Sequence, residues 1–415
     1  MYDNLKLVLT KQENADSGTK SQIIPVIVFV FSIGIVLISF ISVVFPALIL
    51  SSDTVKIPGI VTVTPDLFET GVWSGGVIIT SVIIFSMALL YYKKKIKPLS
   101  RLFEKIFAFE ISKKVSLIIM IILLVIYISA SAGEISTQEN LDDYVEVKKR
   151  LENWSIDSIS GFEPHVRFFL LSSSMVLFGS YKVIPFLASI ALLITIYLIT
   201  KTITQKRFAG IVATIILLQS SIFLAYDTTV SYTNFWILFY LVSLYMVYRL
   251  WPLSPVSYLL SIPSKALTAA FLPMSIYFIL RSQISKKQKM ITAGITAGII
   301  LAGGVATIGG FSATQNTEEK FDAKEFQMGF TSFAYQLRFD GLVILFMIPL
   351  MVGLFIASRK GIKHGESMMV FISGMLLIAP ILTGFTTQTN QPYRFVPLVV
   401  FFAIGVGVLL SKRQT

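Results

Sequence analysis

The sequence predicts an all-α membrane protein that crosses a lipid bilayer eleven or twelve times. Of its 415 residues, 54% are hydrophobic and 14% are charged, and the mean hydropathy is +0.77. A water-soluble domain of this length does not reach such values. Apolar runs long enough to cross a hydrocarbon core of about 30 Å recur along the chain. Because backbone polar groups find no water partner in lipid, each run is predicted to be a helix.

The predicted spans follow one another from the first apolar run to the last. That first run, about 23–50, lacks a small-residue cleavage site, so it is interpreted as a retained span and not as a signal peptide. One further outward pass is expected between Trp251 and Lys265, where three prolines predict a short, broken or re-entrant segment. The other spans are predicted to begin near Ile23, Val72, Val115, Val183, Phe208, Phe235, Ala266, Met290, Leu342, Met368 and Phe395.

The distribution of basic residues predicts the orientation. One set of alternate loops holds 24 of the 35 Lys and Arg residues, and positively charged loops remain on the cytoplasmic side. Both termini and the basic run 93–97 are therefore expected to be cytoplasmic, in a multi-pass protein of the plasma membrane. The net charge of +12 is attributed to this insertion signal and to attraction by anionic lipid, so nucleic acid is not an expected partner.

Several kinds of chemistry are excluded by residue usage. The chain has no cysteine, which excludes disulfides, Cys-ligated zinc, iron–sulfur clusters and thiol nucleophiles. Its two histidines, His165 and His364, are too few for a multi-His metal site. No phosphate-binding glycine loop, dinucleotide fingerprint or Gly-x-Ser-x-Gly elbow stands in a suitable context. ATP-driven pumping and serine hydrolysis are therefore not expected.

Polar residues collect on the predicted external side, above all in the loop 133–181. Eight of the 23 acidic residues lie there, including the adjacent pair Asp142 and Asp143. The segment 145–154 has the apolar spacing of an interfacial amphipathic helix, and a second short juxtamembrane helix is predicted over 164–179, with proline in its first turn. A connection of about fifty residues with its own helices is typical of a functional loop.

Further external positions carry candidate functional side chains. Asp227 ends the span that begins near Phe208, and its alternative role is a solvated acid at a helix end. Lys265 would lie at the external mouth of a cavity beside the broken pass, or would extend to the interface from an ordinary helix end. Tyr393 and Arg394 precede the last span. The planar donors of Arg394 match a lipid phosphate, although pairing with lipid headgroups is the alternative.

The order of these motifs resembles the GT-C superfamily of integral-membrane glycosyltransferases, which includes the protein O-mannosyltransferases and the aminoarabinose transferases. The resemblance covers roughly residues 115–410. It implies a GT-C-like core over 115–415 and an N-terminal two-span extension over 1–114 with a basic cytoplasmic loop. These two extra spans, and the lack of the large soluble C-terminal domain of oligosaccharyltransferases, are departures from the family pattern. The matching motifs are the acidic pair Asp142-Asp143 soon after a span, the proline-led helix within 163–180 that ends in Phe-Gly, the basic turn 201–207, Asp227 at a span end, and Tyr393-Arg394.

The resemblance implies an enzyme that moves a sugar from a polyprenyl-phosphate-linked donor to a protein, lipid or glycan acceptor at the external membrane face. Asp142 or Asp143 would be the general base for the acceptor. Adjacent residues of a regular element point apart, so Asp142 is favoured and Asp143 would cap the next helix. A capping role alone is the alternative for the pair.

The resemblance also implies cations near the departing phosphate, because fixed positive charge stabilises the charge that develops there. Arg394 is the leading candidate, and Lys265, Arg167, Lys182 and Arg338 are the further candidates.

Other side chains complete the expected site. Asp227 would position the acceptor or, together with the loop aspartates, hold a divalent cation such as Mg²⁺ or Mn²⁺. Glu163, His165 and Tyr393 belong to the same motifs and are expected near the substrate. His165 is otherwise a polar residue at a helix start.

Two other classes of protein are compatible with the sequence. A secondary transporter would explain the spans and the proline-rich broken segment, but it would place its polar groups at mid-membrane. A non-catalytic scaffold subunit would use its long external loops to bind a partner, and no activity would depend on the aspartates.

Overall fold

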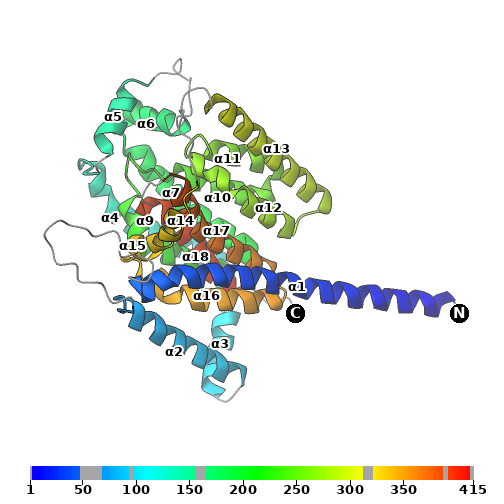
Figure 1. The fold of residues 1–415 in the computed structure, drawn as a ribbon. Coiled ribbons are helices and arrows are strands. Elements are labelled where there is room, and N and C mark those ends of the chain that lie inside the picture. Colours follow the sequence, from blue (N-terminus) through cyan, green and yellow to red (C-terminus); the bar gives the residue numbers. More distant parts are fainter. Residues whose placement is uncertain are drawn as a thin grey trace.

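The computed structural model describes residues 2–46, 68–93, 97–141, 143–154, 165–311, 321–386 and 391–411. In these ranges all regular secondary structure is helical, which confirms the predicted all-α class (Figure 1). Seven of the described helices are long and apolar enough to cross a membrane, so the chain is a multi-pass membrane protein. These seven segments are Ile23–Val44, Ser74–Tyr91, Lys113–Ser136, Val183–Thr204, Gly341–Arg359, His364–Phe385 and Pro392–Leu409.

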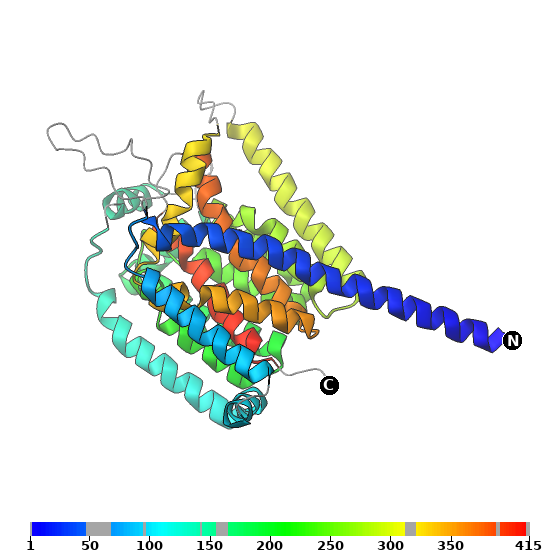
Figure 2. The same cartoon turned by 60° about the horizontal axis from the view of Figure 1, so that its bottom comes forward.

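The N-terminal part forms two long helices followed by a peripheral one. Helix α1 extends well past the rest of the molecule toward the N-terminus (Figures 1 and 2). It packs against α15, α16 and α17, and α2 packs against α16, so the first two long helices contact the rest of the bundle directly. The bounds are α1 Tyr2–Val44, α2 Ser74–Tyr92, α3 Lys97–Ala108 and α4 Lys113–Ser131.

The loop after α4 contains the two predicted short helices. The apolar face of α5 packs against protein: Val147, Leu151 and Trp154 belong to a cluster with residues of α6 and α7. Only Val145 of the expected interfacial stripe points outward, with 74% of its surface exposed. The amphipathic pattern of this helix therefore serves tertiary packing. The bounds here are η3 Ala132–Ile135, α5 Tyr144–Glu152, α6 His165–Phe178 and α7 Val183–Thr204.

Apolar runs in the middle of the chain form shorter helices than the sequence predicts. The run from Phe208 breaks at Gln219 and Ser220, where α8 ends and α9 begins. The expected broken pass after Trp251 consists of a 3₁₀ turn and an eight-residue α-helix. The bounds are α8 Arg207–Leu218, α9 Ser221–Ala225, α10 Phe235–Arg249, η5 Trp251–Leu253, α11 Ser254–Ser261, η6 Ala266–Phe271, α12 Leu272–Arg281 and α13 Lys286–Phe311.

The C-terminal helices supply the centre of the bundle. In α18, 78% of the candidate span is buried inside the protein, against 11% in α2. Helix α18 packs on α7, α8, α16 and α17, and its buried faces carry only apolar residues and glycine. The bounds are α14 Ala323–Gly329, α15 Thr331–Gln336, α16 Gly341–Arg359, α17 Lys363–Thr386, η7 Pro392–Phe395 and α18 Val396–Leu409.

The bundle has two chemically different ends. At the end that we call the basic end, Lys201 is within electrostatic range of Lys113, Arg207 and Arg249. The Lys206 ammonium donates to the carbonyl of Phe107 there. The opposite end, called the loop end, carries residues 132–141 and 143–154, the segment 226–234 and η7. The side chains that the sequence singles out as functional lie mostly at this loop end.

Candidate functional site

Six side chains from five chain segments meet at the loop end, and we call them the loop-end cluster. Asp143 precedes α5, Arg167 lies in the first turn of α6, Tyr232 lies between α9 and α10, and Lys265 precedes η6, while η7 carries the remaining two. The structure therefore brings together five residues that the sequence predicts for the site and adds Tyr232. The cluster consists of Asp143, Arg167, Tyr232, Lys265, Tyr393 and Arg394.

An aromatic pair forms the centre of the cluster. The rings of Tyr232 and Tyr393 stack at a centroid distance of 4.0 Å and an angle of 14°. Tyr226 meets both rings edge-on, at 5.7 Å from Tyr232 and 6.0 Å from Tyr393. These contacts join the segment 226–234 to η7, which lies more than a hundred residues further along the chain. The aromatic pair thus anchors η7, the element that carries Arg394, against the segment 226–234.

Lys265 lies over one face of this pair. Its Nζ is 3.8 Å from the ring centroid of Tyr393 and 5.7 Å from that of Trp236, which is a cation–π arrangement. Among the described residues, Nζ takes part in no ion pair. Burial and the nearby charges of Arg394 and Arg167 lower the pKa of Lys265 well below its ordinary value, and Asp143 opposes this shift. An anion bound here would favour the charged form of this ammonium, as Asp143 does.

Arg167 has a different environment, because its guanidinium is engaged by the backbone. Its Nη2 donates to the carbonyl oxygens of Val230 at 2.9 Å and Ser231 at 2.6 Å. The carboxylate of Glu139 accepts from the amide groups of the same two residues, at 2.7 and 3.0 Å. Burial lowers the pKa of Arg167 to about 10, so it remains charged at neutral pH. Arg167 and Glu139 thus form a clamp that holds the residues just before Tyr232.

Asp143 is the exposed acid of the cluster. It occupies the N-cap position of α5, but its side chain makes no capping hydrogen bond. Its carboxylate instead accepts a hydrogen bond from the hydroxyl of Tyr232. The expectation that Asp143 caps the next helix is therefore wrong, because Tyr232 competes successfully for the carboxylate. Asp142, the favoured base, lies outside the described residues.

Asp227 follows Tyr226, which contacts the aromatic pair, and is 1% exposed. Its Oδ2 accepts from Ser131 Oγ at 2.9 Å, and its backbone oxygen accepts from Ser189 Oγ at 2.7 Å. Burial raises the pKa of Asp227 to about 6, and the hydrogen bond from Ser131 opposes this rise. The solvated helix-end acid that we consider as an alternative is wrong for this residue. A role in contacting an acceptor stays a prediction.

The remaining candidates have other surroundings or lie beyond the described ranges. Arg338 is exposed and stacks on the rings of Tyr335 and Phe339 at 4.8 Å each, near α16. Lys182 donates to the carbonyl oxygen of Glu134 at 2.9 Å. His165 begins α6, as the sequence predicts for a polar residue at a helix start. Glu163 lies outside the described residues.

Metal ligands are not gathered in the part of the chain that the structure describes. No group of three or more His, Asp or Glu side chains there is arranged to hold an ion. Asp142 is missing from the described set, so the expected Mg²⁺ or Mn²⁺ site stays a prediction.

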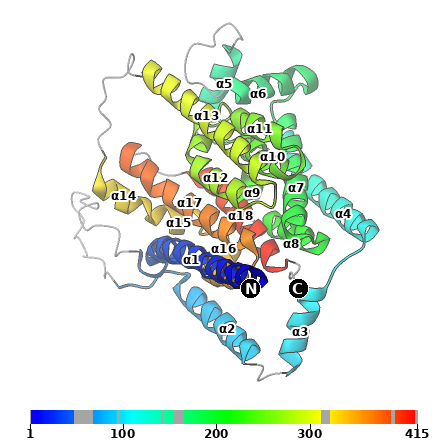
Figure 3. The ribbon, with the colours of Figure 1, turned by 90° about the vertical axis from the view of Figure 1, so that its right-hand side faces the viewer.

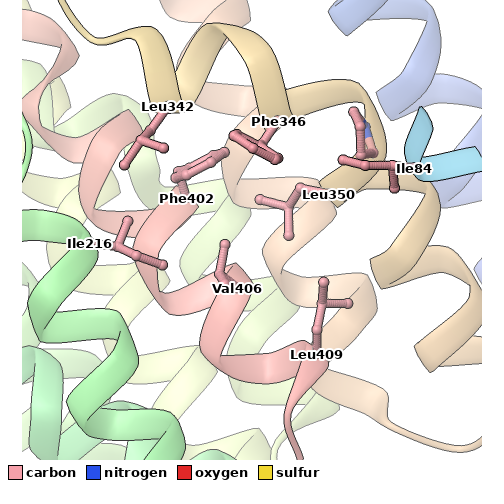
Figure 4. Close-up of a pocket in the computed structure, with 9 residues that line it drawn as sticks. Ile84, Ile216, Leu342, Phe346, Leu350, Phe402, Val406 and Leu409 are labelled. Carbon is pink, nitrogen blue, oxygen red and sulfur yellow. The ribbon is translucent and has the colours of Figure 1, made fainter. Parts of the chain in front are cut away.

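An apolar cavity of about 330 Å³ lies away from the cluster, between α2, α8, α16 and α18 (Figure 4). All of the side chains that line it are apolar, so it suits a hydrocarbon chain and offers no donor or acceptor to a sugar or phosphate. The lining residues are Ile84, Ile216, Leu342, Phe346, Pro349, Leu350, Phe402, Val406 and Leu409.

Three residues of the site are not predicted from the sequence. Tyr232, Glu139 and Trp236 occur in polar or aromatic stretches that carry no known spacing. The run of polar residues 227–234 between two apolar segments is a detectable signal for a functional loop. The partner of Tyr232, however, is 89 residues away, and no local pattern reveals that pairing.

Comparisons with protein-family models, with curated proteins and with solved structures find no match.

Proposed function

We propose that this protein is a membrane glycosyltransferase that moves a sugar from a polyprenyl-phosphate-linked donor to a protein, lipid or glycan acceptor at the external membrane face. The observation that carries the proposal is the pairing, in one cluster, of an exposed carboxylate with two cations that face an aromatic stack. Asp143 supplies the carboxylate, and Lys265 and Arg394, which both lie over the ring of Tyr393, supply the positive charge, since a bound phosphate favours the charged form of Lys265. The order of motifs, which resembles the GT-C superfamily, supports the same proposal.

Each residue of the loop-end cluster has a separate role in the proposed reaction. Asp143 accepts the proton of the incoming hydroxyl, or positions an incoming amide, and Tyr232 holds its carboxylate in place. Lys265 and Arg394 stabilise the negative charge that grows on the phosphate as its bond to the sugar breaks. Stacked tyrosines at the same place offer a surface for the sugar ring. The clamp of Glu139 and Arg167 keeps Tyr232 in position.

The topology that goes with this function has twelve passes. Seven are the long helices, and the other five are α8 with α9, α10, η5 with α11, η6 with α12, and α13. The proposed short outward pass is the stretch from Trp251 to Lys265. Its support is that Lys265 lies near Trp236, in the first turn of α10, so the chain returns to the end of the bundle where α10 begins. We propose that the basic end faces the cytoplasm, because positively charged loops remain on that side. Both termini are then cytoplasmic, and the loop-end cluster lies at the external face of the plasma membrane. The apolar cavity between α2 and α18 offers space for the isoprenoid chain of the donor.

The test is transfer of labelled sugar from polyprenyl-phosphate donors in membranes that contain matched amounts of each variant. Asp143→Asn should reduce turnover by roughly 100- to 10,000-fold if Asp143 is the base. Lys265→Met and Arg394→Gln should each reduce turnover by about 100-fold, since each removes a positive charge that stabilises the departing phosphate. Asp142→Asn belongs in the same series, because Asp142 is the alternative general base.

Two variants serve as matched controls. Glu146→Gln removes a surface acid that pairs with Arg150 on the exposed face of α5, and Arg338→Gln removes an exposed arginine outside the cluster. Both should retain full transfer. Equal activity in all the variants would refute the proposed site. Absence of transfer with every donor, in a protein that remains folded, would favour a transporter or a scaffold subunit.

A further inference from the structure

Helix α3 differs from the other helices of its length, because most of its surface does not pack on the bundle. It connects α2 to α4 at the basic end and lies at the rim of the molecule (Figure 3). The apolar residues Leu102 and Ile106 are 54% and 37% exposed. They share one side of the helix with Phe103 and Phe107, since these positions follow a spacing of three and four residues. An exposed apolar stripe on a short helix needs a partner other than water.

Aromatic residues in α3 and directly after it contact the ends of neighbouring helices. The ring of Phe103 meets Tyr91, in the last turn of α2, edge-on at 5.4 Å. At the other end, Phe109 meets Phe208 at 4.8 Å, and Lys206 donates to the carbonyl oxygen of Phe107. Helices α2 and α4 are both candidate spans, so α3 connects their ends and lies at the level where the hydrocarbon begins.

The opposite side of α3 is basic. Its Lys97, Arg101 and Lys105 are exposed, and so are Lys93 and Lys113 on the two flanks. None of these residues belongs to an ion pair within the described ranges. Glu104 is the single acid of the helix itself. An unneutralised positive surface above an apolar stripe is complementary to anionic lipid headgroups above acyl chains.

We propose that α3 is an interfacial helix that binds the anionic phospholipid surface at the basic end of the protein. Its apolar stripe inserts just below the headgroups, and Arg101 and Lys105 bind the phosphate groups of acidic lipids. This contact holds the α2 and α4 spans at a fixed depth. The inference does not depend on the chemistry at the loop end.

Depth is measured first, with the intact protein in bilayers. Because the natural chain has no cysteine, single variants Ile106→Cys and Glu104→Cys can each carry one spin label. In vesicles that contain phosphatidylglycerol, the label at position 106 should be shielded from a water-soluble relaxation agent and accessible to oxygen. The label at position 104 should show the reverse. Equal exposure of both labels to the water-soluble agent would overturn the proposal.

Lipid preference is measured second, by the fraction of spin-labelled phosphatidylglycerol that the protein immobilises, relative to phosphatidylcholine. In the variant Arg101→Gln/Lys105→Gln, the preference for phosphatidylglycerol over phosphatidylcholine should fall by as much as about fivefold for each charge removed. The matched control Lys286→Gln/Lys287→Gln removes two exposed lysines at the start of α13 and should retain it. Arg101→Lys/Lys105→Arg should also retain it, because the charge is kept. An unchanged preference in the Gln variant of α3, or an equal loss in the control, would refute the assignment.

Discussion

At the scale of single residues, the loop end depends on charged side chains that bind backbone. Glu139 and Arg167 hold both the amide and the carbonyl groups of Val230 and Ser231. Hydrogen bonds to charged groups are stronger than those between neutral groups, so this pair fixes a loop that has no regular structure. Tyr232 follows directly and meets Asp143. Arg167, which sequence reasoning places near substrate phosphate, is thus better explained as a positioning residue.

The buried Asp227 makes stability depend on pH. Burial raises the pKa of Asp227 from the ordinary 3.8 to about 6 in the folded protein. The folded state therefore binds this proton more tightly than the unfolded state, and stability falls as pH rises from about 4 to about 6. Asp227→Asn should abolish that contribution and stabilise the protein at neutral pH by as much as about 3 kcal/mol.

The measurement is the thermal unfolding midpoint in detergent across this pH range, for wild type, Asp227→Asn and the surface control Glu146→Gln. The control should follow the wild type. An Asn variant that keeps the full pH dependence, or that is less stable than wild type at pH 7, would contradict the assigned cause.

At the scale of elements, local breaks shorten the helices near the site. Helix α8 ends at Leu218, and the carboxylate of Asp340 accepts from the amides of Ser221 and Ile222 at 3.0 and 3.1 Å. A tertiary contact thus satisfies the backbone groups that the break leaves open. Helix α10, with 15 residues, rises about 22 Å, less than the usual hydrocarbon thickness. Short helices of this kind are tolerated because protein surrounds them.

Close contact between α18 and its neighbours requires glycine at position 407 but not at position 405. A Cβ added at Gly407 would lie 2.4 Å from Thr200 Cγ2 and 3.1 Å from the carbonyl oxygen of Ala209. A Cβ at Gly405 would meet nothing closer than 3.4 Å. Gly407→Ala should therefore destabilise the protein by about 1–3 kcal/mol, whereas Gly405→Ala should be neutral or stabilising by up to about 1 kcal/mol.

Unfolding midpoints of the two variants test this contrast. Both place the same methyl group on the same helix, so helix propensity cancels between them. If the two variants unfold at the same temperature, the close packing of α18 against α7 and α8 is refuted.

At the scale of the whole molecule, the two ends of the bundle should lie on opposite sides of the membrane. Position 145 is on the exposed face of α5 at the loop end, and position 283 is exposed between α12 and α13 at the basic end. In sealed, right-side-out vesicles, an impermeant maleimide should label Val145→Cys directly. It should label Gln283→Cys only after permeabilisation. If intact vesicles label Gln283→Cys but not Val145→Cys, the true topology is the inverse of the proposed one. If intact vesicles label both variants, the two positions do not lie on opposite sides of the membrane.

The helical class and most helix starts are predictable from the order of residues alone. These features follow from a constraint that acts on each segment alone, because lipid forces every apolar run to satisfy its own backbone. Helix bounds near Gln219 and Pro252 differ because polar and proline residues interrupt the runs and neighbouring helices compensate. Other features emerge only when the helices pack together: Tyr232 binds Asp143, Glu139 and Arg167 bind the same loop, and Asp227 is buried. Those contacts join residues about 60 to 100 positions apart, so packing of the whole bundle is required to bring them together.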